Sequence, residues 1–253
     1  MPSPTARALS LQEQQTLEII ATQVSAAAAS MYMASATQDP IDEKALNKAY
    51  MELVAGAMTA VAGARVAYLQ QFAAAEGKPA FDVPKSALSP KPADVLADGV
   101  QVDGAVPHVV GLQRKWTADL VQQEADRAAR AAEAKLKSAA AEGISDAVDQ
   151  YAPMSYEQMR QEAARMAGNR LSQLAESTVT STSDYVSRSV LEPDKKVAAL
   201  RRVVHPHACE RCTIVAGVLV FKHKPRLRHD QCRCSFEPVY VDDPQYQDRL
   251  FKY

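Results

Sequence analysis

The chain has 253 residues and a formal net charge of −1, and 47% of its residues are hydrophobic. That is enough apolar material for one sizeable core or two modest ones, which excludes a chain that is disordered throughout. Only 6% of the residues are aromatic and alanine supplies much of the rest, so we expect long helices that pack through narrow interfaces. No basic leader with an apolar core and a cleavage site is evident, which favours a cytoplasmic site of synthesis and assembly.

Positive charge is concentrated near the C-terminus. Residues 195–235 contain ten Lys/Arg and two acidic residues, a balance of +8, whereas the first 194 residues carry a balance of −7. We therefore expect a compact basic patch at one end of a mildly acidic molecule.

The N-terminal half predicts two long helices that pair as an antiparallel hairpin. Ser10 and Glu13 have the spacing of a capping box, and the helical pattern that follows stops near Pro40. A second helix is predicted to begin after Asp42 and to end at Gly77.

Two features of these helices allow more than one interpretation. The uncharged stretch 19–38 is interrupted by polar residues and is rich in alanine, so we expect a packed helix and no membrane association. Gly56 and Gly63 lie within the second helix, where each costs about 1 kcal/mol relative to alanine. Either a close helix contact compensates for them, or the helix simply tolerates them.

The middle of the chain predicts a connector and a helical arm. Residues 77–107 contain five prolines and are typical of an extended segment crossing a surface, which would complete a first domain, 1–107. Residues 108–152 form a predicted arm that is solvated or lies against a partner, because nine of the seventeen residues 125–141 are alanine. We expect this helical body to mediate association.

A third domain is predicted over 153–253. Ser155 and Gln158 offer a capping box for a helix that continues through the β-favouring stretch 177–183 to about Leu191, since its apolar residues keep helical spacing. The predicted fold class is therefore mainly α with a small C-terminal α+β domain, in which long alanine-rich helices are followed by a β-hairpin module.

All four cysteines lie close together, as Cys209-x-x-Cys212 and His229-x-x-Cys232-x-Cys234. Zn²⁺ takes four sulfur or nitrogen ligands in a tetrahedron, and such pairs supply them when strands bring the two halves together. The apolar residues 203–204 and 217–221 are predicted to be those strands. The preferred ligands are Cys209, Cys212, His229 and Cys232, with Cys234 as the alternative fourth ligand. The predicted β-hairpin module is therefore zinc-stapled.

Other interpretations of the cysteines remain open at this point. They could form two disulfides, a redox pair or buried inert thiols. If zinc binds, we expect it to be structural and to be the main source of folding free energy in residues 195–241, where large apolar residues are few. No nucleophile elbow, phosphate loop or metalloprotease motif is present, so we expect no enzymatic activity.

The C-terminal stretch resembles a known family. Residues 203–212, with Cys209-x-x-Cys212, are followed by the strand-like 217–221, the motif 229–234 and Pro238-Val239. This pattern is similar to the C-terminal motif of phage minor head proteins of the Mu protein F-like family, particularly the form found in tailed phages of actinobacteria. The resemblance covers roughly residues 155–241.

The resemblance implies a structural component of the virion. Such a protein would be present in a small number of copies at the portal vertex or in the head interior, would act in head assembly, and would contact the portal protein and the major capsid protein. Packaged double-stranded DNA is a further candidate partner.

Two other functions compete with this one. A nucleic-acid-binding zinc module would use the basic residues around the metal to contact phosphate or an acidic surface. A zinc-dependent nuclease would use His229 and Asp230 beside a metal held by Cys234. The basic residues concerned are Lys222, Lys224, Arg226, Arg228 and Arg233.

Overall fold

The computed structural model describes residues 2–36, 43–91, 95, 156–204, 210–214, 216–221, 234–244 and 246. The chain divides into two compact units. The larger comprises residues 1–24, 52–106 and 175–253, and the smaller comprises 25–51 and 107–174. The predicted arm 108–152 and the domain boundaries at 107 and 152 lie outside the described residues.

Helix α1 (Pro4–Ala36) begins six residues before the predicted capping box. Ser3 caps it, because the Ser3 hydroxyl accepts a hydrogen bond from the Ala6 amide at 3.2 Å and Pro4 occupies the first helical position. The prediction that Ser10 and Glu13 cap this helix is wrong. Both residues lie inside α1 and are buried, so their spacing reflects tertiary contacts rather than a helix start.

Helix α2 (Glu43–Ala75) confirms the second predicted helix. At its end, Gly77 adopts φ 64°. The Gly77 amide donates to the Ala74 carbonyl and the Lys78 amide donates to the Ala73 carbonyl, which is the Schellman arrangement. The predicted stop at Gly77 is therefore correct, and its cause is the left-handed conformation that glycine adopts without strain.

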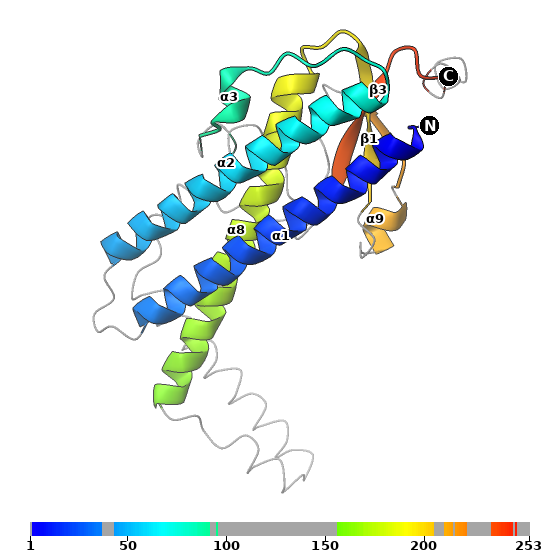
Figure 1. Cartoon of the computed structure of the whole chain (residues 1–253). Helices are drawn as coiled ribbons and strands as arrows, with labels where there is room; N and C mark the ends of the chain where they lie inside the picture. The colour runs from blue at the N-terminus through cyan, green and yellow to red at the C-terminus, as the bar shows by residue number, and fades with distance from the viewer. Residues whose placement is uncertain are drawn as a thin grey trace, which may run out of the picture. The chain divides into compact units, whose positions relative to one another are not determined.

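Within the larger unit, α1 and α2 run antiparallel, as predicted. The Ser3 amide donates to Glu76, Ser10 contacts Tyr68 and Glu13 pairs with Arg65. Residues later in α1 thus contact residues earlier in the sequence of α2, as antiparallel helices do. Figure 1 shows the two helices side by side.

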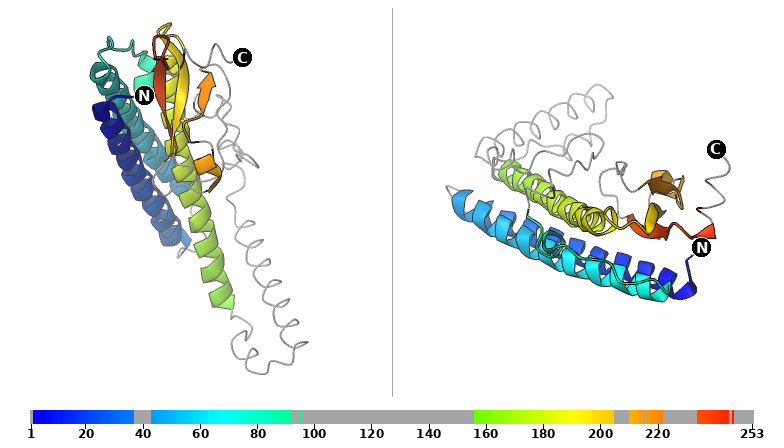
Figure 2. Two further views of the ribbon diagram at one scale, coloured as in Figure 1. Left: turned by 90° about the vertical axis from the view of Figure 1, so that its right-hand side faces the viewer. Right: turned by 90° about the horizontal axis from the view of Figure 1, so that it is seen from above.

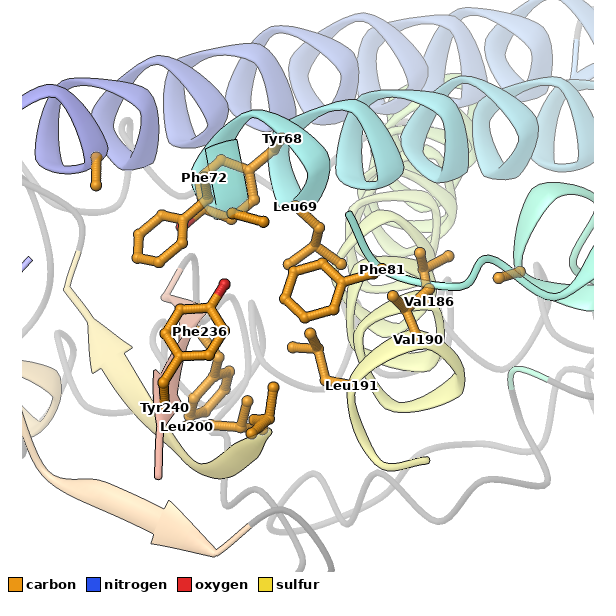
Figure 3. Close-up of a cluster of buried hydrophobic side chains, with 14 of the residues drawn as sticks. Tyr68, Leu69, Phe72, Phe81, Val186, Val190, Leu191, Leu200, Phe236 and Tyr240 are labelled. Carbon is orange, nitrogen blue, oxygen red and sulfur yellow. The ribbon is translucent and has the colours of Figure 1, made fainter. Parts of the chain in front are cut away.

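The connector after α2 is not simply a surface crossing, as its sequence predicted. Phe81 is only 4% exposed, and its backbone forms two hydrogen bonds with the Gln70 side chain. A short helix, α3 (Lys85–Leu88), then buries Ala87. The first part of the connector therefore belongs to the core of the larger unit (Figure 3).

Helix α8 (Tyr156–Leu191) confirms the third predicted helix through the β-favouring stretch. Hydroxyl groups in and just after this stretch donate back to carbonyls four residues earlier, as Thr182 does to Thr178 at 2.8 Å and Ser187 does to Ser183 at 2.6 Å. Local hydrogen bonds of this kind satisfy side chains that would otherwise favour other conformations. Burial of this part of the helix then outweighs its low helix propensity.

Three strands follow, in the spatial order β2-β1-β3, and all pairs are antiparallel. The central strand β1 (Val197–Val203) pairs Leu200 with Val220 of β2 (Leu219–Phe221) and with Pro238 of β3 (Ser235–Tyr240). The chain therefore has the predicted class, mainly helical with a small C-terminal sheet. In Figure 2, β1 and β3 lie beside the C-terminal part of α8.

Strand β3 was not predicted. Its sequence contains Pro238 and Glu237, which are unusual in a strand, yet all six of its residues are buried. Proline is tolerated because β3 is an edge strand. Phe236 and Tyr240 enter the main core, which fixes the strand against the helices.

The main core joins residues from all of these elements. Its largest side chains come from α2, the connector, α8 and the sheet (Figure 3). They are Tyr68, Leu69, Phe72, Phe81, Val186, Val190, Leu191, Leu200, Phe236 and Tyr240.

The smaller unit shows close helix packing between α1 and α8. A Cβ atom on Gly168 would lie 3.4 Å from the Ala29 carbonyl oxygen, and the Ser25 and Ser172 hydroxyls are hydrogen-bonded. Gly56 and Gly63 of α2 differ from Gly168, because nothing lies within 4 Å of a Cβ built on either. The described structure thus gives no close contact that would compensate for these two glycines.

One described helix segment, Lys48–Ala75 of α2, is long and apolar enough to reach the composition of a membrane span. Core helices have the same composition. Met58, Val61, Leu69 and Phe72 of this segment are buried within the protein, and 44% of its apolar window is buried.

Candidate metal centre and polar core

The two described cysteines lie together where β1 ends and β3 begins. Cys212 lies in the short helix α9 (Glu210–Ile214), and Cys234 directly precedes β3. Both are thiols, 2% and 3% exposed, and they form one buried cluster with Val204 packed against it. Strand pairing of β1 with β2 and β3 thus brings together one cysteine from each half of the predicted cluster.

The other predicted ligands, Cys209, His229 and Cys232, lie outside the described residues, as do Lys222, Lys224, Arg226, Arg228 and Arg233. Among the residues that the structure describes, no group of three or more potential ligands is found. The donor chemistry nevertheless fits zinc. Two buried sulfurs adjoin each other, and each is two or three residues from a further sulfur in the sequence.

The sheet has a source of stability other than a metal. Val197, Leu200, Phe236 and Tyr240 belong to the main core that α1 and α2 share. Burial of large side chains such as these contributes about 1.5–3 kcal/mol each. The expectation that zinc supplies most of the folding free energy in residues 195–241 therefore does not fit β1 and β3.

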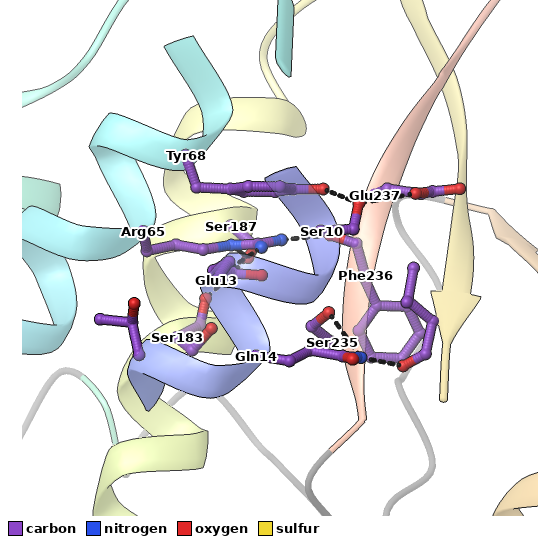
Figure 4. A network of polar contacts seen from close by, with 12 residues as sticks. Ser10, Glu13, Gln14, Arg65, Tyr68, Ser183, Ser187, Ser235, Phe236 and Glu237 are labelled. Atoms are coloured by element: carbon purple, nitrogen blue, oxygen red, sulfur yellow. Dashed lines mark hydrogen bonds and ion pairs between the residues drawn. The ribbon is translucent and has the colours of Figure 1, made fainter. Parts of the chain in front are cut away.

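A second cluster of polar residues lies inside the larger unit (Figure 4). Arg65 of α2 is 1% exposed, and its guanidinium contacts three other elements. It donates to Glu13 of α1 at 2.6 Å, to Ser187 of α8 at 2.7 Å and to the Phe236 carbonyl of β3. Its charge also lies 4.8 Å from the centre of the Tyr68 ring. One buried cation thus connects the helices with the sheet.

Glu237 of β3 forms a second part of this cluster. Its Oε2 accepts a hydrogen bond from the Ser10 hydroxyl at 3.0 Å, and its Oε1 accepts one from Arg201 at 3.0 Å. Burial raises the pKa of Glu237, and the nearby Arg201 cation and the Ser10 hydrogen bond offset only part of that rise. Burial likewise raises the pKa of Tyr68, whose hydroxyl lies 2.9 Å from Ser10. The cluster thus places charged groups in the interior of the larger unit.

Sequence patterns indicated no buried role for these polar residues, although one signal was available. Arg65 is the only charged residue between Glu52 and Glu76, and it continues the stripe of Met58, Val61 and Leu69 along α2. A single charge within a buried stripe indicates a buried partner of opposite charge.

Two of the ten basic residues in 195–235 form contacts inside the protein and do not belong to the predicted basic patch. Arg201 pairs with Glu237 at 3.0 Å and with Asp243 at 3.4 Å. Arg202 is 7% exposed, and its guanidinium lies 5.3 Å from the centre of the Phe236 ring. A predicted basic surface must therefore depend mainly on the residues after Phe221.

Comparison with known proteins adds no assignment, because no protein-family model, curated protein or solved structure matches the chain.

Proposed function

We propose that the chain is a minor head protein of a tailed phage, a structural component of the virion located at the portal vertex or in the head interior. The observation that carries this proposal is the buried meeting of Cys212 and Cys234. The C-terminal motif resembles that of the Mu protein F-like family. A metal shared by the two halves of this motif requires that they lie close together, and the contact between Cys212 and Cys234 supports this. The mainly helical fold with a small C-terminal sheet agrees with this proposal.

Zinc is the proposed cofactor, and its role is structural. Cys212 and Cys234 would both be ligands, with Cys209 and either Cys232 or His229 completing the tetrahedron. Because Cys234 lies beside Cys212, we propose it as a ligand in its own right and not only as an alternative to His229. The metal would hold α9 and the residues between β2 and β3 onto the sheet, while the shared core stabilises β1 and β3.

Zinc content tests the metal site directly. Protein purified under reducing conditions should contain about one equivalent of zinc, and Cys212→Ser and Cys234→Ser should each lower that content strongly. Ser89→Ala changes an exposed residue that is distant in the sequence from the cysteines. This variant is the control, and its zinc content should equal that of the wild type. Retention of a full equivalent by Cys234→Ser, with loss in His229→Ala, would return the fourth position to histidine.

The head assignment needs a separate experiment. Heads purified from infected cells should contain the wild-type chain in a small, fixed number of copies per portal. The Cys212→Ser chain should be depleted from heads, and Glu52→Gln, which changes an exposed residue of α2, should enter normally. If wild-type protein is absent from DNA-filled heads, the chain is not a virion component.

A nucleic-acid-binding role is the second candidate and is compatible with the first. The basic residues after Phe221 support it, since release of counterions from phosphate makes such contacts strongly dependent on salt. A fourfold glutamine variant of Lys222, Lys224, Arg226 and Arg228 should lose DNA binding at low salt. Unchanged binding would exclude these residues as the contact.

A further inference from the structure

The two edge strands of the sheet are protected to different degrees. Strand β3 contains Pro238, all of its residues are buried, and Glu237 accepts a hydrogen bond from Ser10 of α1. Proline, charge and a covering helix are features that keep an edge strand from pairing with another chain. Strand β2, at the opposite edge, contains neither proline nor a charged residue. In the left view of Figure 2 it lies on the side of β1 away from α1 and α2.

The pairing of β2 with β1 fixes which of its backbone groups point outward. The Arg202 amide donates to the Val218 carbonyl at 3.1 Å, and the same register continues through Val220. Backbone groups of successive residues point to opposite sides of a strand, so Val218 and Val220 direct theirs toward β1. Leu219 and Phe221 therefore direct their amides and carbonyls away from the sheet, where they have no partner among the described residues.

The side chains along this edge are apolar and accessible. Phe221 is 58% exposed and Val218 is 43% exposed. Val220 packs against the main core, so Leu219 and Phe221 lie on the opposite face of the strand. Free backbone groups beside exposed apolar side chains are the features that let another strand add to a sheet.

The spacing of the free groups favours a second copy of β2 as the added strand. One free residue lies on each side of Val220, so a two-fold axis beside Val220 places Leu219 opposite the partner's Phe221, and the reverse. Each of these two pairs exchanges two hydrogen bonds, so every outward amide and carbonyl of both strands is satisfied. A leucine opposite a phenylalanine is also a favourable cross-strand contact, and β2 carries no charge that would repel its own copy.

We propose that β2 pairs antiparallel with β2 of a second copy of this chain, so that two three-stranded sheets become one continuous sheet. This inference rests on the proposed function, which gathers a small number of copies at one vertex. Two strands of three residues bury far less than the roughly 1,200–2,000 Å² of a stable interface. The pairing is therefore weak in dilute solution and depends on a high local concentration.

Sedimentation equilibrium of the full chain under reducing conditions tests the pairing. The average mass should rise from that of a monomer toward that of a dimer between about 10 μM and about 1 mM. Leu219→Pro should stay monomeric over this range, because it removes an outward amide at a position where an edge strand tolerates proline. Leu219→Ile, the matched control, keeps the amide and should associate as the wild type does. A wild-type chain that is monomeric at about 1 mM, or a Leu219→Pro chain that dimerises equally well, would overturn the proposal.

Amide hydrogen exchange tests the interface without any variant. The amides of Leu219 and Phe221 should exchange at least about tenfold more slowly at about 1 mM than at about 10 μM. The Val220 amide, which points toward β1, should be equally protected at both concentrations. A dimer in which the Leu219 and Phe221 amides stay unprotected would place the interface elsewhere and overturn the proposal. Protection that appears only when portal protein is added would assign the edge to another protein and would also overturn it.

Head composition separates this inference from the proposed function. If the chain pairs through β2 in solution but is absent from purified heads, the pairing stands and the head assignment fails. If heads contain wild type and Leu219→Pro in equal copy numbers and the amides show no protection at high concentration, the head assignment stands and the pairing fails.

Discussion

Arg65 illustrates how a single residue connects elements that are distant in the sequence. Its donors reach α1, α8 and β3 at once, and Glu13 supplies the opposite charge in the same buried region. A buried ion pair is weak evidence for net stability, because both charges lose water. Breaking such a pair, however, leaves one charge buried and uncompensated.

We therefore expect Arg65→Met to destabilise the chain by about 3–5 kcal/mol. Glu13→Met combined with Arg65→Met should be more stable than Arg65→Met alone, because the double change removes both charges. Chemical denaturation measures both effects, and Lys48→Met, at an exposed position of the same helix, is the control. A loss below about 1 kcal/mol for Arg65→Met would show that the guanidinium is replaceable.

Glu237 gives a prediction for pH dependence. Its pKa in the folded chain lies above the ordinary value of about 4.5, because burial disfavours the charged form. The folded state therefore binds a proton more tightly than the unfolded state does. The stability that comes from this proton is fully present below the ordinary pKa and is lost as the pH rises through the raised pKa.

Glu237→Gln should remove this loss. The free energy of unfolding of the variant, relative to wild type, should increase as the pH rises from about 4.5 through the raised pKa of Glu237. Asp242→Asn provides the opposite sign, since a hydrogen bond from Lys78 lowers the pKa of exposed Asp242. A difference between Glu237→Gln and wild type that stays constant with pH would contradict the raised pKa.

At the scale of elements, Gly63 inside α2 and Gly77 just after its end form a matched pair. Gly77 has a positive φ that an L-residue adopts only with strain, whereas Gly63 is helical and has nothing within 4 Å of a Cβ position. Gly77→Ala should lower the free energy of unfolding by about 1 kcal/mol. Gly63→Ala should raise it by about the same amount. Thermal denaturation of the two variants should therefore show Tm shifts of opposite sign, and a fall for Gly63→Ala would show that its position is constrained.

The sequence predicted those elements whose patterns are local and long. Two helices in the N-terminal half and the helix ending at Leu191 are present, and β2 lies within the predicted strand 217–221. The strand predicted at 203–204 is only the end of β1, which begins at Val197. The start of α1 and strand β3 could not be predicted, because both depend on tertiary contacts. Ser10 and Glu13 have the spacing of a capping box, but their polar groups contact Tyr68, Glu237 and Arg65 and do not cap the helix.

The candidate metal centre was predictable in part for the same reason. The spacing of the cysteines indicated that the two halves meet, and Cys212 and Cys234 do so. Spacing alone ranked Cys234 below His229, since it carries no information about where β3 begins. A recess beside Cys234 is lined by residues of α1 and α8 that are more than 150 residues apart in the sequence, so no local pattern indicated it.

At the scale of the whole molecule, the sheet is not built as a separate body. Its inward side chains share one core with α1, α2 and the connector, and Arg65 and Ser10 bind β3 through polar contacts. The C-terminal motif and the N-terminal helices should therefore fold together. Any function of the motif would then depend on helices that lie more than 130 residues away in the sequence.

A fragment of residues 153–253 should consequently fail to fold alone, even with zinc present. It lacks Tyr68, Leu69, Phe72 and Phe81, and loss of a single buried aromatic side chain already costs about 3–5 kcal/mol. Residues 1–95, added as a separate chain, should restore folding, because they supply these side chains together with Arg65. Near-ultraviolet circular dichroism and amide dispersion in NMR spectra measure the outcome. A dispersed spectrum from the fragment alone in zinc would show that the metal suffices and that the shared core is dispensable for the sheet.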